Sequence, residues 1–488
     1  MDGLITILLC ITLSIPLIIF MLSRHGSKNL PPGPPALLFI AKMLMLGSPI
    51  YHIGTVLRSL HARYGPIISV CLGRTFVFVA DRRLAHSALV KGGGNFDTRP
   101  PPSKDFTLFL GGSMSASPLG DYFRLVRRNL HSQALHPSRV RLFAPARQRV
   151  CDALVGSLRR DRDAASEGTV TVRSLMRRCL FDLLTSMTFG VSLGQEVLDE
   201  MQQMQLQISD IISRFPVLSI FQFITKRLLR KEWALHLALR ERQKELMLPL
   251  IRARRGHDGP QCYADSLLEL RVAEEGGRPL TDDEMVSLCS EFMIASTDTS
   301  VALLEWIMAD LVNHPDVQAK LYEEVRGKPE LSEEDLSGMP YLKAIVLEGL
   351  RLHPTGHLVF PHGVQSDKEL GGYMVPKGAD INFLVSDFGL DETVWPAPRE
   401  FRPARFLNNH GVDITCTKEM KMAPFGAGRR MCPGYVLATL HAEYLVGSLV
   451  REFQWLPPAG QDTVDMTEEL AMAINMKHPL RARIIPRA

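Results

Sequence analysis

Several features that would indicate a nucleic-acid-binding, disulfide-linked or dinucleotide-binding protein are missing from this 488-residue sequence. The formal net charge is only +4, and no basic tract is interleaved with aromatic residues, which argues against nucleic acid as a partner. The eight cysteines are scattered, without a CxxC pair or zinc-finger spacing, so we expect reduced thiols in a cytosol-facing protein. No GxGxxG motif occurs, and the chain therefore carries no sign of a fused dinucleotide-binding domain.

One long hydrophobic run lies close to the N-terminus. It extends from Leu4 to Leu22, 19 residues without a charge, and is long enough to span a bilayer. Asp2 precedes the run and Arg24 and Lys28 follow it, which disfavours a cleavable signal peptide and places the rest of the chain in the cytosol. We therefore expect an uncleaved membrane anchor over residues 1–23, with a buried core helix as the alternative.

The rest of the chain has the pattern of one mainly helical body. A proline-rich stretch, residues 24–36, favours stiff extended backbone and is expected to act as a hinge. Residues 67–80 predict two short strands around a Gly-Arg turn, helical periodicity dominates from about 120 to 355, and strand-like runs return between 357 and 385. We predict a single catalytic domain over residues 37–488, mainly α with small β-sheets (α+β).

A glycine-rich segment that ends in Cys432 carries the strongest chemical signal. Pro433 suits the first position of a helix, which would place Cys432 at the N-cap. The unpaired N–H groups and partial positive charge of a helix N-terminus favour thiolate over thiol. Gly428 and Gly434 permit a sharp turn or the close approach of a flat ligand. A buried structural cysteine in a Gly/Arg loop is the alternative.

Five residues of this segment have a spacing that resembles the haem-binding loop of the cytochrome P-450 family, the haem-thiolate monooxygenases: Phe425, Gly428, Arg430, Cys432 and Gly434. The resemblance implies the cytochrome P-450 fold and a haem cofactor, with Cys432 as the axial iron ligand and the other four as cofactor-binding residues. A thiolate ligand pushes electron density towards cleavage of the O–O bond. The resemblance covers essentially the whole chain and looks most like plant microsomal members.

A long helix is expected over residues 281–313. Thr281 and Glu284 form a capping box at its start, and His314-Pro315 ends the helical pattern. Five successive polar residues, 296–300, interrupt its apolar frame. Buried polar groups are costly without partners, so the segment forms a water-facing turn, a cluster bonded to i−4 carbonyls, or a functional site.

The same segment resembles the oxygen-activation motif of the cytochrome P-450 family. On that match, Thr299 and Asp298 are candidate catalytic residues. Thr299 would hold dioxygen through its hydroxyl, and Asp298 would supply protons through its side chain or water. Ser296 occupies the position where the family carries glycine, which lets the helix widen.

Glu348 and Arg351 are spaced i,i+3 and therefore share one face of a helix. In isolation they would be a surface pair of little energy. Their neighbours in the sequence are apolar, however, and the segment around Arg405 resembles the family's Pro-x-Arg-Phe segment. The resemblance implies a buried Glu348/Arg351/Arg405 network that holds the neighbourhood of the cysteine loop.

Three residues are candidates for binding the haem propionates. Arg430 lies in the cysteine loop, and Arg127 lies in a segment that resembles the family's Trp-x-x-x-Arg helix, with Phe123 in place of the tryptophan. His362 stands where the family often carries a further propionate partner. An ordinary solvated charge is the alternative for each.

The resemblance implies an enzyme that inserts one oxygen atom from O₂ into a lipophilic small molecule. Electrons would come from NADPH through a separate NADPH–cytochrome reductase, with cytochrome b5 as an optional second partner. The implied location is the endoplasmic reticulum membrane, with a single span and a cytosolic catalytic domain. One rival is a haem-thiolate isomerase or dehydratase that needs no reductase, which Asp298 and Thr299 disfavour; another is an inactive haem-binding protein, suggested by Ser296 and Phe123.

Overall fold

Two units, each with its own core, make up the described part of the chain. The computed structural model describes residues 29–45, 53–102, 104–165, 167–218, 230–256, 261–328, 330–407 and 412–487. The first unit, which we call the sheet unit, contains the residues up to 101 together with 356–396 and 413–431; the second, the helical unit, contains 102–355, 397–412 and 432–488. The predicted anchor, residues 1–23, lies outside the described residues.

A four-stranded sheet organises the sheet unit, with strand order β1-β2-β9-β6. β1 (Ile67–Cys71) and β2 (Thr75–Val79) form the predicted antiparallel hairpin. β9 (Asp380–Phe383) pairs with β2 in parallel, and β6 (His362–Gly363) is antiparallel to β9. The strand-like run at 357–385 is therefore confirmed at β6 and β9, whereas residues 358–360 form no strand.

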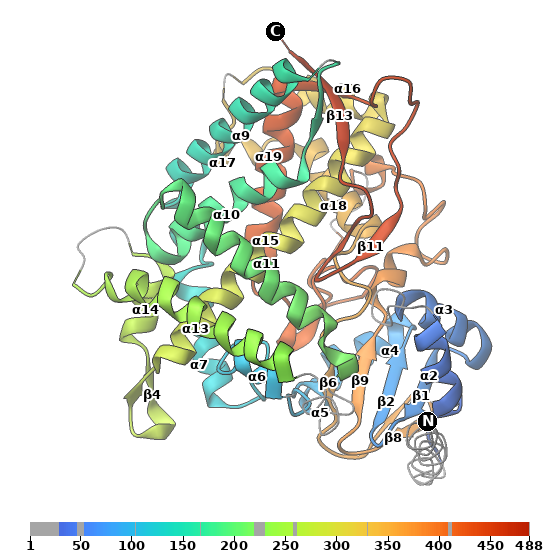
Figure 1. The fold of residues 1–488 in the computed structure, drawn as a ribbon. Coiled ribbons are helices and arrows are strands. Elements are labelled where there is room, and N and C mark those ends of the chain that lie inside the picture. Colours follow the sequence, from blue (N-terminus) through green and yellow to red (C-terminus); the bar gives the residue numbers. More distant parts are fainter. Residues whose placement is uncertain are drawn as a thin grey trace, which may run out of the picture. The chain divides into compact units, whose positions relative to one another are not determined.

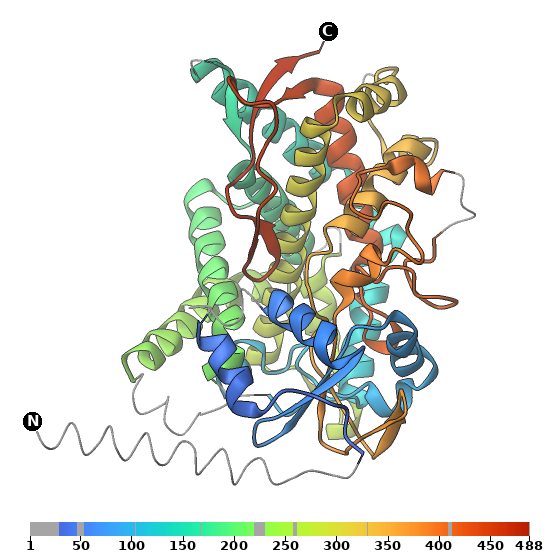
Figure 2. The same ribbon diagram turned by 90° about the vertical axis from the view of Figure 1, so that its right-hand side faces the viewer.

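Successive residues of a strand point to opposite faces of the sheet. Both faces of this sheet are covered. Ile68 and Val70 pack on one face against α2 (Ala36–Met45) and α3 (Ile53–Tyr64), which Figure 2 shows in blue beside the strands. Val77 and Val79 pack on the other face. The remaining elements of the unit are α4 (Arg82–His86), the π-helix η1 (Ser87–Lys91), α5 (Gly93–Phe96), the hairpin β7 (Lys368–Leu370) and β8 (Tyr373–Val375), and the 3-10 helices η4 (Val385–Leu390) and η6 (Gly428–Arg430).

A long helix, α15 (Asp282–Asn313), runs through the helical unit (Figure 1). It is buried along most of its length. The helices packed around it are α6 (Lys104–Leu110), α10 (Arg173–Phe189), α11 (Gln195–Leu218), α13 (Arg230–Arg252), α14 (Tyr263–Glu269), α16 (Pro315–Val325), α18 (Pro340–Leu352) and α19 (Tyr435–Glu452). The other helices are α7 (Asp121–Gln133), α8 (Pro137–Arg141), α9 (Ala144–Ala164), α17 (Glu333–Leu336), η3 (Ala273–Glu275) and η5 (Pro403–Phe406).

Short strands complete the helical unit. One sheet has the order β10-β13-β3, and the other two are two-stranded. Their strands are β3 (Thr169–Thr171), β10 (Phe453–Leu456) and β13 (Arg481–Pro486), then β11 (Glu468–Leu470) with β12 (Ile474–Met476), and β4 (Arg271–Val272) with β5 (Arg278–Pro279). The prediction of a mainly helical protein with small sheets is confirmed.

The ends of α15 are those that the sequence predicts. Thr281 Oγ1 accepts a hydrogen bond from Glu284 N–H (3.2 Å), and Glu284 Oε2 accepts one from Thr281 N–H (2.8 Å). The helix ends at Asn313, and Pro315 begins α16. Among the described residues, α15 is the one helix long and apolar enough to cross a membrane, and 83% of its apolar stretch is buried inside the protein. It is the core helix of the unit.

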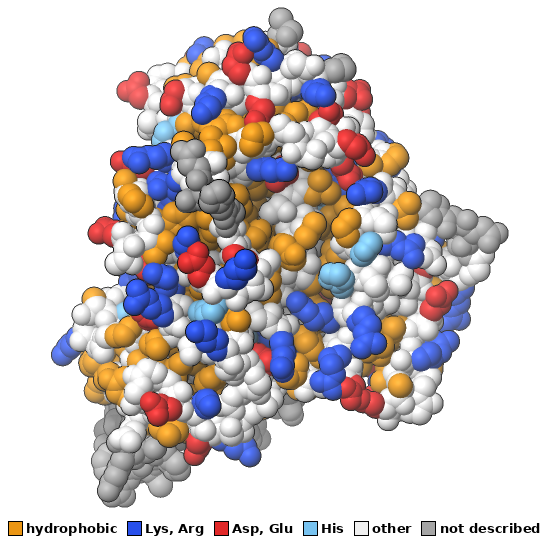
Figure 3. Space-filling view, turned by 180° about the vertical axis from the view of Figure 1, so that it is seen from behind, with side chains coloured by type: hydrophobic (Ala, Val, Ile, Leu, Met, Phe, Trp, Pro, Cys, Tyr) orange, Lys and Arg blue, Asp and Glu red, His pale blue; other side chains and the backbone are white. Residues whose placement is uncertain are grey.

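The surface carries charges of both signs. On the face shown in Figure 3, Lys and Arg side chains are mixed with Asp and Glu side chains, and hydrophobic side chains lie between them. This mixture agrees with the small formal net charge of +4.

The protonation of Glu443, on α19, makes the stability of the folded protein depend on pH. Burial raises the pKa of this carboxyl to about 7, against a smaller opposing effect of Lys343. The folded protein therefore binds more protons than the unfolded chain between about pH 4.5 and pH 7, and stability falls as pH rises through that range. We expect Glu443→Gln to gain stability relative to wild type as pH rises from about 5.5 to about 8, by on the order of 1 kcal/mol after solvent screening.

Thermal unfolding midpoints of wild type, Glu443→Gln and the exposed-site control Glu334→Gln, measured across this pH range, test the expectation. The control should keep a constant difference from wild type. A constant difference for Glu443→Gln as well would contradict a raised pKa at Glu443.

Candidate functional site

The cysteine loop turns where two glycines adopt left-handed backbone. Gly426 and Gly428 have φ values of 70° and 72°. A Cβ atom at Gly428 would lie 2.2 Å from Leu89 O, so this position has no room for a side chain. Phe425 is half-buried beside this turn. After Met431 the chain leaves the sheet unit, and Cys432 belongs to the helical unit.

Cys432 is not the N-cap of the following helix, contrary to the prediction. α19 begins at Tyr435, with Gly434 as its N-cap, and Pro433 lies in the preceding turn. Proline fits this turn as well as it fits a first helical position, because both require φ near −65°. The backbone N–H of Gly434 nevertheless donates to Cys432 Sγ. The thiol therefore has the amide donor that a helix N-terminus was expected to supply.

Among the described cysteines, Cys432 alone is exposed to solvent. Five others are buried: Cys151, Cys179, Cys262, Cys289 and Cys416. Burial raises the pKa of each, to about 11 for Cys151 and Cys262 and about 12 for Cys416. These five are structural thiols, whereas Cys432 keeps accessible surface even though the surrounding protein desolvates its thiol.

Two opposing influences act on the Cys432 thiol. The surrounding protein raises its pKa by desolvation, and the Gly434 N–H and the charge of Arg127 lower it. Arg127 lies on α7, half-buried, with its guanidinium 5.9 Å from the centre of the Phe123 ring. Burial lowers the pKa of this guanidinium, while the Cys432 thiolate would raise it. Within the helical unit, a cation and a thiol are thus close enough to influence each other.

In the sheet unit, two arginines and a histidine lie together around residues 96–99. Arg430 Nε donates to Asp97 O (2.8 Å), and His362 Nδ1 donates to Phe96 O (2.5 Å). Arg99 donates to the carbonyls of Phe360 (3.0 Å) and Pro361 (2.8 Å). These bonds orient both guanidinium groups.

His362 is neutral in this arrangement. Burial, Arg99 and Arg430 together lower its pKa to about 3, although the bond to Phe96 opposes them. Because Nδ1 carries the proton, Nε2 is an acceptor and does not offer an anion a donor. Arg99, which the sequence analysis did not select, provides a second cation beside Arg430. Its position directly before Pro100 is the only local signal, and it does not distinguish Arg99 from other loop arginines.

Asp298 and Thr299 point to different sides of α15. Asp298 Oδ2 accepts from Ser209 Oγ (2.7 Å), and Asp298 Oδ1 lies 3.3 Å from Arg177 Nη2, so the carboxylate faces α11 and α10. Thr299 Oγ1 donates to Ala295 O (2.6 Å) and shares the more exposed side of the helix with Ala295. Adjacent helical residues are about 100° apart around the axis. The helix is unbroken at Ser296.

The structure bears on two of the three predicted alternatives. Bonding to i−4 carbonyls occurs at Thr299 and at Thr297, whose Oγ1 donates to Met293 O (2.8 Å). A water-facing turn is wrong for Asp298, which is 8% exposed and ion-paired. The helix α15 therefore carries a buried carboxylate with two partners and, on its more exposed side, a hydroxyl. Groups of these two types can take part in proton transfer.

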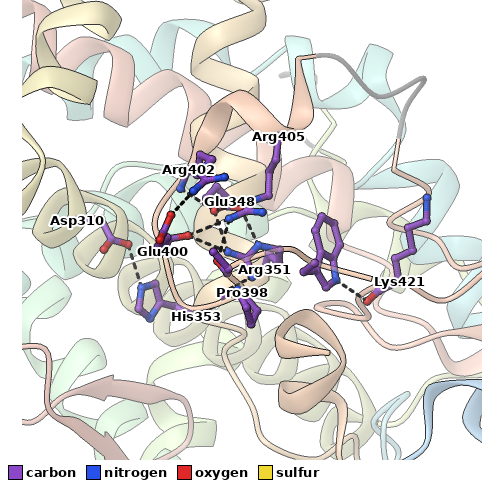
Figure 4. A network of polar contacts seen from close by, with 11 residues as sticks. Asp310, Glu348, Arg351, His353, Pro398, Glu400, Arg402, Arg405 and Lys421 are labelled. Carbon is purple, nitrogen blue, oxygen red and sulfur yellow. Dashed lines mark hydrogen bonds and ion pairs between the residues drawn. The ribbon is translucent and has the colours of Figure 1, made fainter. Parts of the chain in front are cut away.

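The predicted Glu348/Arg351/Arg405 network is confirmed (Figure 4). Arg351 forms a bidentate pair with Glu348, with Nε–Oε2 at 2.7 Å and Nη2–Oε1 at 2.8 Å, and Arg405 Nε lies 2.9 Å from Glu348 Oε1. The side chains of Glu348 and Arg351 have no exposed surface. The charges are therefore fully desolvated and depend on one another.

Backbone groups, which the sequence analysis did not anticipate, complete this network. Arg402 N–H donates to Glu348 Oε1 (2.8 Å). Arg351 donates to Pro398 O (2.6 Å) and Glu400 O (3.2 Å), and Arg405 Nη2 also reaches Glu400 O (3.2 Å). The network thus fixes the loop 397–402 against α18.

Comparison with known proteins identifies the family. The family model described as "Cytochrome P450" matches residues 31–483. The chain belongs to the cytochrome P450 family. It is 40% identical to Cytochrome P450 89A9 of Arabidopsis thaliana over 96% of each chain, and 31% identical to carnosic acid synthase of Salvia pomifera over 94% of each. Geraniol 8-hydroxylase of Catharanthus roseus is 28% identical, again over 94% of each.

Solved structures support the same fold. A zebra fish cytochrome P450 structure with abiraterone superposes with a TM-score of 0.72, covering 93% of this chain and all of that one at 21% identity. The cytochrome P450 fold, with its mainly helical body and small sheets, is therefore the fold of this protein. The protein is a P450 monooxygenase, an oxidoreductase, and its cofactor is haem.

Proposed function

We propose that this P450 inserts one oxygen atom from O₂ into a lipophilic small molecule, using NADPH electrons delivered by a separate NADPH–cytochrome reductase, with cytochrome b5 as an optional second partner. The observation that carries the proposal is Cys432, the one exposed thiol of the described residues, with an amide donor from Gly434. Thiolate is the form that ligates iron and that favours O–O cleavage.

The residues present fit haem. Cys432 would ligate the haem iron, Gly428 and Gly434 would leave room for a flat macrocycle near the backbone, and Phe425 would supply an apolar contact. Arg430, Arg127 and, as an addition, Arg99 are the cations available for the two propionates. His362 would act there only after binding a proton, since its ring is neutral in this structure. Bound haem supplies the transfer of electrons to dioxygen and the cleavage of its bond.

The protein's own contribution to the chemistry is to hold and move protons on α15. Asp298 holds a proton or releases it at Oδ1 or Oδ2 while Ser209 and Arg177 keep the carboxyl on the α10–α11 side. Thr299 Oγ1 donates to Ala295 O and retains lone pairs with which it can accept a hydrogen bond from water or from protonated Asp298. A change in the side-chain torsion of Asp298, or an intervening water, would connect the two groups.

The proposal also includes a membrane anchor and a surface that attracts the reductase. Residues 1–23 would anchor the protein in the endoplasmic reticulum membrane and residues 24–36 would act as the hinge, with the catalytic domain 37–488 in the cytosol. Exposed arginines of the helical unit, Arg124, Arg128 and Arg141, would steer an acidic reductase towards the protein.

Thr299→Ala is expected to uncouple electron use from product formation. Without the hydroxyl, protons reach dioxygen less selectively, so NADPH oxidation continues while peroxide replaces product. Product formed per NADPH should fall by at least about tenfold. The measurement is NADPH, peroxide and product in the reconstituted system of full-length protein and reductase, across a panel of lipophilic substrates.

Thr185→Ala is the matched control, because Thr185 on α10 makes the same type of bond to Phe181 O (2.8 Å). Its coupling should equal that of wild type. Unchanged coupling in Thr299→Ala would remove Thr299 from the mechanism. Turnover of wild type without NADPH would instead favour an isomerase or dehydratase, and NADPH consumption without any product would favour an inactive haem-binding protein.

A further inference from the structure

A small cavity lies beside Asp298, on the side of α15 that faces α10 and α11. Its volume is about 10 Å³, measured for the centre of a water molecule, which is the room that a single water requires. Most of its lining is apolar and comes from Phe181, Leu206, Met293 and Ile294, while its polar groups come mainly from Asp298, Gln205, Gln202 and Arg177. A cavity of this size has room for one water, which needs at least two polar partners to stay bound.

Gln205, on α11, brings an unused donor to this cavity. The residue is 4% exposed, and its Nε2 has no hydrogen-bond partner among the described residues. A buried amide donor without a partner destabilises the fold, which favours a water at this position. Asp298, in contrast, has acceptor capacity to spare, since a carboxylate offers about four lone-pair sites and Ser209 and Arg177 occupy two.

A chain of hydrogen bonds fixes the orientation of the Gln205 amide. Arg240 has only donors, so its Nη1 must donate to Gln243 Oε1 (2.6 Å), which makes Gln243 Nε2 the donor to Ser290 Oγ (2.7 Å). The single proton of Ser290 then goes to Gln205 Oε1 (3.0 Å). Exchanging the oxygen and nitrogen of the Gln205 amide would break the hydrogen bond from Ser290. The NH₂ group therefore stays at the end of the chain of hydrogen bonds, without a partner among the described residues.

We infer that the cavity holds one ordered water, which accepts from Gln205 Nε2 and donates to Asp298, and that Gln205 is a positioning residue for proton delivery. This inference rests on the role proposed for Asp298. Each group in this chain of hydrogen bonds then donates to the next one, from the Arg240 guanidinium to the Asp298 carboxylate. Each proton that leaves Asp298 is replaced by one from the water, which takes a proton from bulk solvent past half-buried Gln202; no electron moves.

Gln205→Met tests this inference because it keeps the length of the side chain and removes the donor. The first measurement is a high-resolution crystal structure of the full-length, haem-loaded wild type and variant. We expect one water within hydrogen-bond distance of Gln205 and Asp298 in wild type, and none in the variant. An empty cavity, or one closed by side chains in wild type, would overturn the proposal.

The second measurement is turnover with the reductase. Gln205→Met should lower product per NADPH by about threefold, enlarge the solvent deuterium isotope effect on kcat, and leave KM for the substrate unchanged. Gln207→Leu, an exposed position on the same helix, should match wild type. A variant that loses the water yet keeps wild-type coupling and isotope effect would refute the positioning role of Gln205.

The two measurements separate this inference from the proposed function. If Asp298→Asn leaves coupling unchanged, the role of Asp298 fails, and the relay fails with it even where diffraction shows the water. If Asp298→Asn uncouples the enzyme and Gln205→Met does not, only the relay fails.

Discussion

Glu348→Ala is expected to lower the free energy of unfolding by about 3–5 kcal/mol, a large part of the stability of a typical folded domain. Glu348 is the carboxylate that joins Arg351 to Arg405. Its removal leaves two guanidinium groups near each other, one of them without any exposed surface, and it also frees the Arg402 amide. Haem retention should fall with stability, because the loop 397–402 loses its attachment to α18.

Denaturant unfolding of the purified full-length protein, together with Soret absorbance per mole of protein, measures both effects. Glu400→Ala is the matched control: its side chain is 60% exposed and pairs with Arg402, while its carbonyl, which the network uses, remains. The control should change stability by no more than about 0.5 kcal/mol. Similar losses in both variants would contradict the buried network.

Cys432→Ser is expected to abolish oxygen insertion and to leave the fold intact. A serine hydroxyl can still accept from the Gly434 N–H, but it is not ionised near neutral pH and cannot replace a thiolate as an electron-rich ligand. Serine differs from cysteine only in having oxygen in place of sulfur, so the substitution leaves the packing around residue 432 largely unchanged. Product formation in the reconstituted system should fall below detection, whereas the unfolding midpoint should stay close to that of wild type.

Cys71→Ser provides the control, since Cys71 is the half-buried cysteine of β1. This variant should keep wild-type turnover. Product formation by Cys432→Ser at a rate near that of Cys71→Ser would show that the chemistry does not depend on Cys432.

Local signals account for the parts of the fold that the sequence predicts correctly. The capping box of Thr281 and Glu284 and the proline after His314 set the ends of α15, because each acts within one helical turn. The hairpin of β1 and β2 follows from two apolar runs around one short turn. The Glu348–Arg351 pair follows from i,i+3 spacing.

The remaining features depend on contacts that sequence patterns do not carry. The polar residues 296–300 surround the helix, and the partners Ser209 and Arg177 decide that Asp298 faces α10 and α11. Pro433 predicts a start of α19 that is two residues too early, because proline fits a turn as well as a helix. Arg99 was missed because backbone carbonyls orient it, and carbonyl positions in loops leave no mark on the sequence.

The central claim is that Cys432 is the thiolate ligand of the haem iron. The most direct measurement is the absorption spectrum of the reduced, carbon-monoxide-bound full-length protein, recorded for wild type, Cys71→Ser and Cys432→Ser at equal haem content. A red-shifted Soret band, the signature of a thiolate ligand, is predicted for wild type and Cys71→Ser and should be lost in Cys432→Ser. A folded, haem-loaded wild type without this band, or a Cys432→Ser variant that keeps it, would contradict the claim.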